Sequence, residues 1–270
     1  MSYVPPLPSG NYSGWLALQR QMPAQRAVFE RQPVQQRQAE YFPEKIGNVT
    51  TAENLVKDRQ LLNVALGAFG LSEDINNRFY IQKILEGGTM REGALALRLS
   101  DPRYREIAGA FGFGDFTTPS TKLSDFADKI ISAWQERSFE TAVGQVNENL
   151  RLALNIQREL GKLASNEDTS DQTKWYSILG QPPLRKVFEV VFNLPLAFGV
   201  LNVDRQVQLL SEKAKAFFGD ESPAQFSNPE NMDKLVRRFL LQSDVSATTG
   251  SANASVRGSA ALSLLQMRNA

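Results

Sequence analysis

The sequence predicts an all-α fold, a multihelical bundle of roughly ten helices with one long central helix. Apolar residues return at three- and four-residue steps along most of the chain, as they do on the buried face of a helix. Alternating runs typical of strands are nearly lacking, and the hairpin dipeptides Asn-Gly and Asp-Gly do not occur. With 270 residues, 42% of them hydrophobic, the chain can bury a sizeable core.

Composition divides the chain into three parts. We expect residues 1–45 to form an N-terminal arm with a short helix, and residues 46–242 a helical core that can be divided into two subdomains meeting near residues 165–182. Residues 243–270 begin with a run of Ser, Ala, Thr, Gly and Asn, which favours a flexible tether. The apolar residues within 260–267 predict a short C-terminal helix.

Capping residues and glycines predict the helices of the first half. Thr51 begins a helix whose apolar face continues until Gly70 stops the pattern. A second apolar stripe starts at Ile75 and ends at Gly87 and Gly88, a residue type suited to a left-handed C-cap. Two shorter helices follow, at residues 89–99 and 101–110, the latter capped by Asp101.

Two five-residue words are near copies of each other. They are Leu-Gly-Ala-Phe-Gly at 66–70 and Ala-Gly-Ala-Phe-Gly at 108–112, each at the predicted end of a helix. A small duplication would explain them, and so would a shared way of burying an aromatic ring while the chain turns on a glycine. The surrounding residues do not align, which favours the second explanation.

The longest periodic segment runs from Phe139 to Ala164 without a proline. At 1.5 Å per residue, one helix over this segment would be on the order of 39 Å long and could form the spine of the bundle. Its heptads are imperfect around Gln157, so we interpret it as core scaffold and not as a partner-binding zipper. Ser170 or Asp171 caps the next helix. Further helices are expected at residues 184–194, 203–218 and 229–241.

The chain contains no histidine and no cysteine. This excludes thiolate nucleophiles, disulfides, thiolate zinc or iron–sulfur sites and imidazole acid–base chemistry. Adjacent acids such as Glu73 and Asp74 are better explained as partners of helix N-termini than as a catalytic pair. We therefore assign no catalytic residue, no metal ligand and no cofactor.

Charge is balanced, with 30 basic and 29 acidic residues, so no nucleic-acid partner is expected from net charge. A local basic segment contains Arg20, Arg26, Arg31 and Arg37. The most apolar stretch, residues 187–201, is interrupted by Pro195 and Gly199 and is shorter than the roughly 20 residues of a membrane-spanning helix. The N-terminal residues lack the features of a Sec signal peptide.

Several phrases of the sequence resemble an uncharacterised bacterial family, a domain of unknown function whose members tend to be encoded among flagellar genes in alphaproteobacteria. They are DRQLLNVALGAFGLSEDI (58–75), KILEGG (83–88), DPRYREIAGAFGFGD (101–115), AVGQVNENLRLALNIQREL (142–160) and ILGQPPLRKVFEVVFNLP (178–195). The resemblance spans roughly residues 50–242. It implies an all-helical protein that helps to build or operate the flagellum, located in the cytoplasm or exported through the flagellar apparatus. It implies no catalytic residue.

Three hypotheses about function stay open. The first is a non-enzymatic helical protein of the flagellum that acts in assembly or structure by contacting flagellar proteins, with a homo-oligomer possible. The second is an enzyme that uses carboxylates or lysine in a cleft of the bundle. The third is nucleic-acid binding through the segment from Arg20 to Arg37, which would be sensitive to salt.

Two places are candidate contact sites under the first hypothesis. One is the aromatic surface near Trp15, and the other is the apolar C-terminal tip with Leu262, Leu265 and Met267. Each could instead be folded back onto its own domain.

Overall fold

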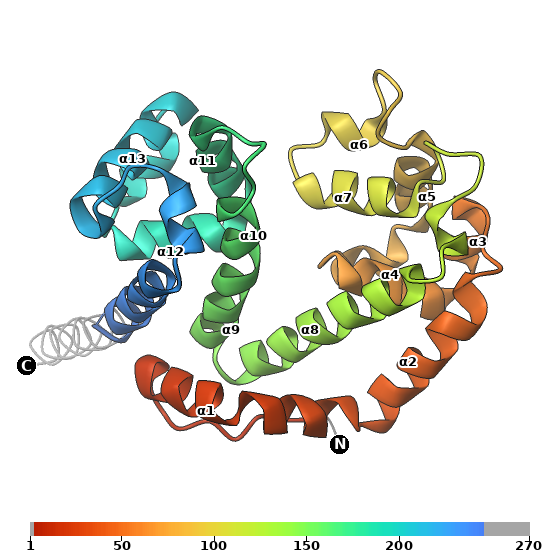
Figure 1. The fold of residues 1–270 in the computed structure, drawn as a ribbon, viewed down its shortest axis with the longest axis horizontal. Coiled ribbons are helices and arrows are strands. Elements are labelled where there is room, and N and C mark those ends of the chain that lie inside the picture. The colour runs from red at the N-terminus through yellow and green to blue at the C-terminus, as the bar shows by residue number, and fades with distance from the viewer. Residues whose placement is uncertain (1–2, 246–270) are drawn as a thin grey trace, which may run out of the picture. The chain divides into compact units, whose positions relative to one another are not determined.

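The computed structural model describes residues 3–245, and the regular elements in this range are all helices (Figure 1). This confirms the all-α prediction for the described residues. They divide into two compact units. Unit 1 comprises residues 3–5 and 21–146, and unit 2 comprises residues 6–20 and 147–245. Helix α1 (Asn11–Glu30) contributes to both, because the division falls between Arg20 and Gln21.

Unit 1 is built around α4 (Arg59–Ala68), which packs against α2 (Pro33–Ile46) and α8 (Phe126–Val146). Seven of the ten residues of α4 are buried, as expected for a helix enclosed by others. The other elements of unit 1 are α3 (Ala52–Lys57), the 3₁₀-helix η1 (Ser72–Asn76), α5 (Arg78–Gly87), α6 (Leu95–Arg98), α7 (Pro102–Phe111) and the 3₁₀-helix η2 (Ser120–Lys122).

Close packing of α4 on α8 depends on Gly67. A Cβ atom at this position would lie 2.6 Å from Cδ1 of Trp134, which is itself a buried residue of α8. No carbon pair tolerates that separation without a shift of the structure. The glycine therefore allows the two helices to approach.

Unit 2 contains α9 (Glu148–Asn155), the π-helical turn η3 (Ile156–Leu160) and α10 (Gly161–Ala164), which follow one another without a break. After them come α11 (Asp171–Gly180), α12 (Pro182–Val191), the 3₁₀-helix η4 (Leu196–Val200), α13 (Val203–Phe218), the 3₁₀-helix η5 (Pro223–Ser227) and helical residues 229–245. Aromatic rings with centroids 5.2–6.3 Å apart form part of its core. They belong to Trp175, Phe188, Phe192, Phe218 and Phe226.

The prediction of one long helix from Phe139 to Ala164 is wrong. Helix α8 ends at Val146, and Asn147 has extended backbone angles (φ −151°, ψ 107°). The Asn147 side chain accepts hydrogen bonds from the N–H groups of Asn149 and Leu150, so it caps a new helix. Apolar periodicity continued across this break because both helices bury residues on either side of it. Asparagine is a preferred residue at the start of a helix, so Asn147 indicated the break, but the prediction followed the apolar periodicity instead.

Asp58 divides the predicted first helix in the same way. Its side chain accepts hydrogen bonds from the N–H groups of Gln60 and Leu61, so α3 ends and α4 begins there. In the segment predicted as a helix over residues 89–99, the structure has only α6, with four helical residues. Phe79 falls within the predicted second apolar stripe, which runs from Ile75 to Gly88, but its side chain is 73% exposed.

Other predicted boundaries are confirmed. Asp101 caps α7, Ser170 caps α11, and α13 spans the predicted residues 203–218. The two similar words each end on a glycine with positive φ, Gly70 at 71° and Gly112 at 66°.

In the second half of the chain, the boundary between the units lies between residues 146 and 147, whereas the sequence predicted a junction near residues 165–182. Residues of the predicted arm contribute to the cores, since Leu18, Phe29 and Phe42 are buried.

The predicted C-terminal helix at 260–267 lies outside the described residues. Within residues 3–245, no helix combines the length and apolar character that crossing a membrane requires.

Candidate functional site

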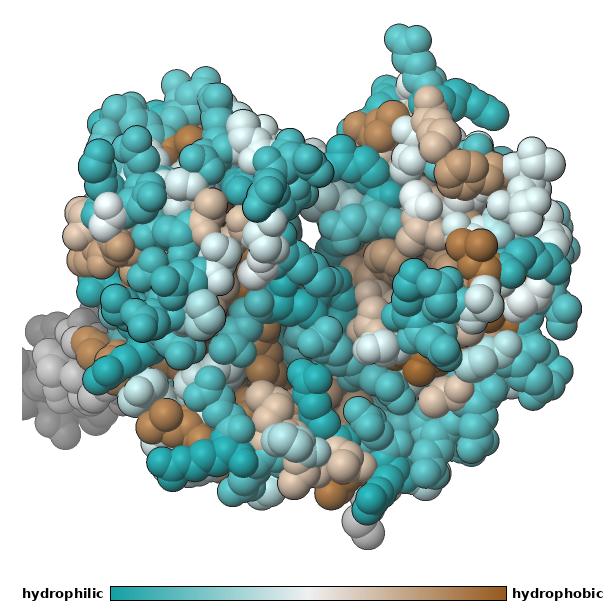
Figure 2. Space-filling model, in the orientation of Figure 1, coloured by the Kyte–Doolittle hydropathy of each residue, from teal (hydrophilic) through white to brown (hydrophobic). Residues whose placement is uncertain are grey.

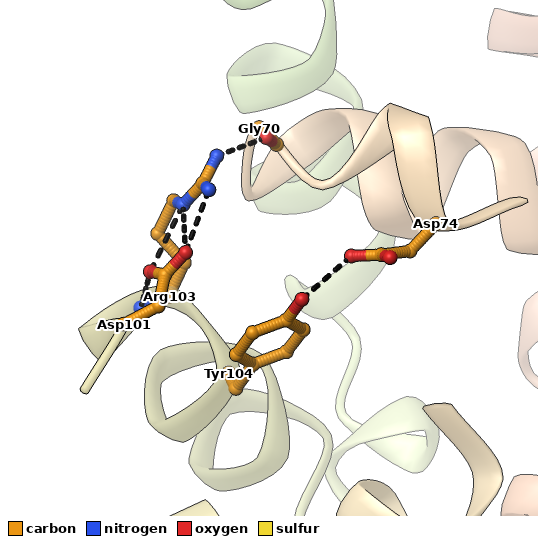
Figure 3. A network of polar contacts seen from close by, with 5 residues as sticks. All are labelled: Gly70, Asp74, Asp101, Arg103 and Tyr104. Carbon is orange, nitrogen blue, oxygen red and sulfur yellow. Dashed lines mark hydrogen bonds and ion pairs between the residues drawn. The ribbon is translucent and has the colours of Figure 1, made fainter. Parts of the chain in front are cut away.

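A polar network in unit 1 joins the start of α7 to the end of α4 (Figure 3). The Arg103 guanidinium donates from Nη2 to Oδ2 of Asp101 at 2.6 Å, and Nη1 donates to the carbonyl oxygen of Gly70. The neighbouring Tyr104 donates its hydroxyl to Oδ2 of Asp74 at 2.8 Å. Asp101 also accepts from the N–H of Arg103, so the residue that caps α7 positions the arginine as well.

The network fixes the protonation states of its members. Partial burial alone would raise the pKa of Asp101, but the hydrogen bonds and charge of Arg103 hold that pKa below its usual value. The hydrogen bond to Asp101 raises the pKa of Arg103, although burial opposes it. Burial, followed by the hydrogen bond to Asp74, raises the pKa of Tyr104. At neutral pH these groups stay anionic, cationic and neutral respectively, as their contacts require.

A second arginine reaches the same helix end. Nε of Arg137, from α8, donates to the carbonyl oxygen of Ala68 at 2.8 Å. The last carbonyl groups of a helix lack partners within the helix, and arginine side chains often supply them. The network therefore holds α4, α7 and α8 together, which is a structural task.

Asp115 connects two glycine-containing loops of unit 1. Its carboxylate accepts hydrogen bonds from the N–H groups of Thr89 (2.6 Å) and Met90 (2.9 Å) and from the Thr89 hydroxyl (2.9 Å). Gly88 has a φ of 64°, and a Cβ atom there would collide with the Asp115 carboxylate. The two loops are thus fixed together while Met90 and Phe116 remain exposed.

The most exposed aliphatic side chains of unit 2 lie close together in sequence, and we call residues 196–203 the η4 segment. Leu196 is fully exposed, and Val200 is 86% exposed. Leu201 and Val203 are also exposed. On the face seen in Figure 2, hydrophobic residues occur in small groups between hydrophilic ones. Clustered exposed aliphatic side chains are typical of protein contact sites.

The η4 segment is held in place by contacts with neighbouring residues of unit 2. Phe198 is buried, and the Arg185 guanidinium lies 5.8 Å from the centroid of its ring. The Gln206 side chain donates to the carbonyl oxygen of Leu201 at 2.7 Å, and Asn202 caps α13. A fixed segment loses little conformational entropy when a partner covers it. This arrangement is suited to binding.

Unit 1 also has an open cleft with a volume of about 440 Å³. It is bordered by Tyr3, the end of α1, the start of α2 and the second half of α8. Its nine lining residues carry amide, hydroxyl, aromatic and aliphatic side chains, and none is an acid, a lysine or an arginine. The cleft is therefore equipped for neutral hydrogen-bonding ligands.

Two ionisable side chains, one from the predicted basic segment and one buried in unit 2, serve local contacts. Arg26, from the basic segment, lies 3.6 Å from Glu136 and stacks over the ring of Phe139. The buried Lys174 donates to the carbonyl oxygen of Ala164, at the end of α10. Among the described residues, no group of three or more acidic side chains is placed to hold a metal ion.

Of the contact residues predicted from the sequence, the structure describes Trp15 and not the other three. Trp15 is 3% exposed, so it is a core residue of unit 2 and offers no contact surface, which corresponds to its folded-back alternative. Leu262, Leu265 and Met267 lie outside the described residues, and their role stays a prediction.

Sequence reasoning missed the η4 segment. The signal was present, because Pro195 and Gly199 interrupt an apolar stretch where a buried helix would otherwise continue.

Comparison with known proteins identifies a family. The model of a protein family described as "Protein of unknown function (DUF1217)" matches residues 68–232. The chain belongs to this family.

A solved structure has a similar fold. The chain is similar to a protein from Agrobacterium tumefaciens whose X-ray crystal structure was determined in a structural genomics programme. The two are 25% identical, with a TM-score of 0.71, and the similarity covers 89% of this chain and 97% of that one. No curated protein matches the chain.

The family region contains some of the sites described above and not others. The Arg103 network, the Asp115 loops and the η4 segment all lie within residues 68–232. The cleft combines residues 138–145 of that region with residues 3 and 29–35, which precede it.

Proposed function

We propose that this DUF1217 protein acts by binding other proteins, in the assembly or structure of the bacterial flagellum, and not by catalysis. The η4 segment carries the binding part of the proposal, because its exposed aliphatic side chains sit on an anchored segment. The flagellar part rests on the sequence phrases that resemble a family encoded among flagellar genes. In this proposal the protein works in the cytoplasm or passes through the flagellar export apparatus.

The chemistry of the η4 segment defines its partner. Leu196, Val200 and Val203 offer apolar surface, and covering such surface contributes roughly 25 cal/mol per Å². The partner surface is therefore apolar and shaped to receive branched aliphatic side chains. A helix with an apolar face fits this description best.

The enzyme hypothesis needs a buried carboxylate or amine that faces a cleft. Lys174 is the buried amine in the described residues, and its contact with the Ala164 carbonyl oxygen serves the end of a helix. Glu140 is a buried carboxylate, but among residues 3–245 neither it nor Lys174 lines the open cleft, so no contact there favours this second function. It stays a hypothesis, and turnover by the pure protein would be its evidence.

A complementation experiment tests the proposal. A strain lacking the gene is given back the wild-type gene, the double variant Leu196→Ser with Val200→Ser, or the control Val28→Ser. Val28 is an exposed aliphatic residue of α1, so its replacement has a similar local effect without touching the η4 segment. We expect loss of swimming in the deletion strain and in the double variant, and full swimming with the control. Cell fractionation in the same strains distinguishes cytoplasmic from exported protein.

Normal swimming and intact flagella in the deletion strain would refute the flagellar part. If the deletion strain does not swim but the double variant swims normally at wild-type protein levels, the η4 segment is not the contact site.

A further inference from the structure

The last described helix of unit 2, residues 229–245, packs against the chain just ahead of the η4 segment. Nε of Arg238 donates to the carbonyl oxygen of Val191 at 2.9 Å. One turn later, Gln242, with its amide nitrogen turned toward the same oxygen, donates to it at 3.0 Å. Val191 ends α12, and the η4 segment begins five residues later at Leu196. The chain therefore leaves the described residues close to the start of the η4 segment.

The apolar C-terminal tip, residues 260–267, has enough chain before it to reach the η4 segment. From Val245 to Leu196 the path is three helical residues, the Gln242 contact and five residues of chain, which gives a separation of at most roughly 35 Å. From Val245 to Leu262 there are 17 residues, for which the sequence predicts a tether. A tether of that length has a root-mean-square span of roughly 20–25 Å and a full extension of about 55–60 Å.

The tip and the η4 segment have matching chemistry. No residue from 194 to 203 is charged, and none from 259 to 267 is charged. Leu262 and Leu265 are three residues apart, so they share one face of the predicted helix. Contact between the two segments would bury aliphatic side chains and would take no charged group out of water. The tip is thus an apolar helical segment of the kind that suits the η4 segment.

No other part of unit 2 within residues 6–20 and 147–245 exposes several aliphatic side chains in one short segment. Its remaining exposed large apolar side chains are Leu16, Phe217, Leu241 and Val245. Leu16 is only 37% exposed, and the Arg238 guanidinium lies 3.9 Å from the centroid of the Phe217 ring. Leu241 and Val245 belong to the helix that leads to the tether. The η4 segment is therefore the best matched surface for the tip.

We propose that the C-terminal tip covers the η4 segment of its own chain, as an autoinhibitory contact that a partner protein displaces. This inference rests on the proposed function, in which the η4 segment binds the partner. A tether of the predicted length and composition holds the tip at a concentration on the order of 1 mM, so a contact of millimolar affinity is occupied about half of the time. The apparent affinity for the partner is then about twofold lower than without the tip.

Paramagnetic relaxation in the full chain tests the contact. The chain has no cysteine, so Asn269→Cys provides a single attachment site for a nitroxide label just beyond the tip. Methyl signals of Ala197 and Val200 are recorded by nuclear magnetic resonance before and after chemical reduction of the nitroxide. We expect both signals to be broadened by the nitroxide and to recover on its reduction.

Variants of the labelled chain locate the contact. Leu262→Ser with Leu265→Ser is expected to abolish the broadening, because it removes the apolar face of the tip. The matched control, Ser263→Ala with Gln266→Ser, keeps both leucines and is expected to retain the broadening. On the other side of the contact, Leu196→Ser is expected to reduce it. Leu196 is fully exposed, so this variant should melt at the wild-type temperature.

A mixed sample separates a contact within one chain from a contact between copies. It combines isotope-labelled chains without nitroxide and nitroxide-labelled chains without isotope. The proposal predicts no broadening in this sample. Broadening equal to that within one chain would mean that a second copy supplies the tip, and it would overturn the proposal. Absence of broadening in the singly labelled chain, or broadening that survives loss of both leucines, would overturn it too.

Failure of this inference can be distinguished from failure of the proposed function. If the tip causes no broadening while the Leu196→Ser and Val200→Ser double variant does not swim, the autoinhibitory contact is refuted and the proposed function stands. If the broadening depends on the tip but the double variant swims normally, the contact exists and its autoinhibitory role is refuted.

Discussion

Arg103 connects two of the five sequence phrases that resemble the family, residues 58–75 and 101–115. It follows Asp101 and Pro102 at the start of α7 and reaches the carbonyl oxygen of Gly70, at the end of the first of the two similar words. One guanidinium thereby satisfies a helix end and a carboxylate at once. This part of the sequence therefore contributes to the packing of unit 1.

Replacing Arg103 by leucine should lower the free energy of unfolding by about 1–2 kcal/mol, because the Gly70 carbonyl oxygen and Asp101 lose a charged donor. The pKa of Asp101 is lowered in the folded protein, so its contribution is present above the ordinary carboxyl value and disappears as the pH falls through the folded value. The stability difference between wild type and variant should therefore shrink in acid. Urea unfolding at several pH values measures it, with Arg105→Leu, an exposed position of α7, as the control. Equal losses for both variants would contradict the assignment.

Ionisation of Tyr104 should lower the stability of the protein at alkaline pH. Its pKa is raised in the folded protein, so its contribution is complete below about pH 10 and is lost as the pH rises through the folded value. Tyr104→Phe cannot ionise at this position. We expect the stability of wild type relative to Tyr104→Phe to fall above about pH 10. Unfolding curves measure this. A stability difference that stays constant with pH would show that Tyr104 titrates normally.

Two glycine-to-alanine changes should have opposite effects. Gly67→Ala places a Cβ atom against Trp134, and we expect a loss of about 1–3 kcal/mol in the free energy of unfolding. Gly161 has helical backbone angles, and apart from its own stretch of backbone no atom lies within 4 Å of the position that a Cβ would occupy there. Gly161→Ala should therefore gain up to about 1 kcal/mol from helix propensity. Thermal unfolding compares the two variants directly. A stabilised Gly67→Ala protein would mean that α4 and α8 are less tightly packed than described.

At the scale of elements, capping residues decide where the helices of this protein begin. Asn147→Ala removes the acceptor for two N–H groups of α9 and should lower the free energy of unfolding by about 1 kcal/mol. Asn147→Asp keeps an acceptor at the helix N-terminus and should retain most of the stability. Chemical denaturation of both variants checks the prediction. If the alanine variant equals the wild type, the cap is not what separates α8 from α9.

The same elements show how much of the fold can be predicted from sequence. Helix α13 could be predicted to the residue, because Asn202 caps its start and Gly219 follows its end with a φ of 99°. The break at Asn147 was missed, because the spacing of apolar residues does not show where a capping residue ends one helix and begins the next. The exposure of Leu196 was missed too, because periodicity identifies apolar residues without showing which of them find a core.

The cleft was not predictable for a different reason. It brings Tyr3, Gln35 and Thr141 together from three distant parts of the chain, and none of them forms a recognisable motif. The chemistry excluded by composition was easier to establish. Absence of histidine and cysteine is a property of the sequence, and folding cannot change it.

At the scale of the whole molecule, the family model and the similar solved structure match different lengths of the chain. The DUF1217 match includes parts of both units, and the Agrobacterium tumefaciens structure resembles 89% of the chain. Of the two units, unit 2 contains the η4 segment, to which we have given the binding role in the proposed function. We propose that the protein works by contacting flagellar proteins through the η4 segment.

Photo-crosslinking in living cells tests this claim most directly. A photoreactive amino acid replaces Leu196 in the chromosomal gene, and another strain carries it at the exposed Val28 as the control. After irradiation, the adducts are isolated and identified by mass spectrometry. We predict adducts with flagellar proteins from position 196 and not from position 28. Adducts that contain no flagellar protein, or the same adducts from both positions, would contradict the claim.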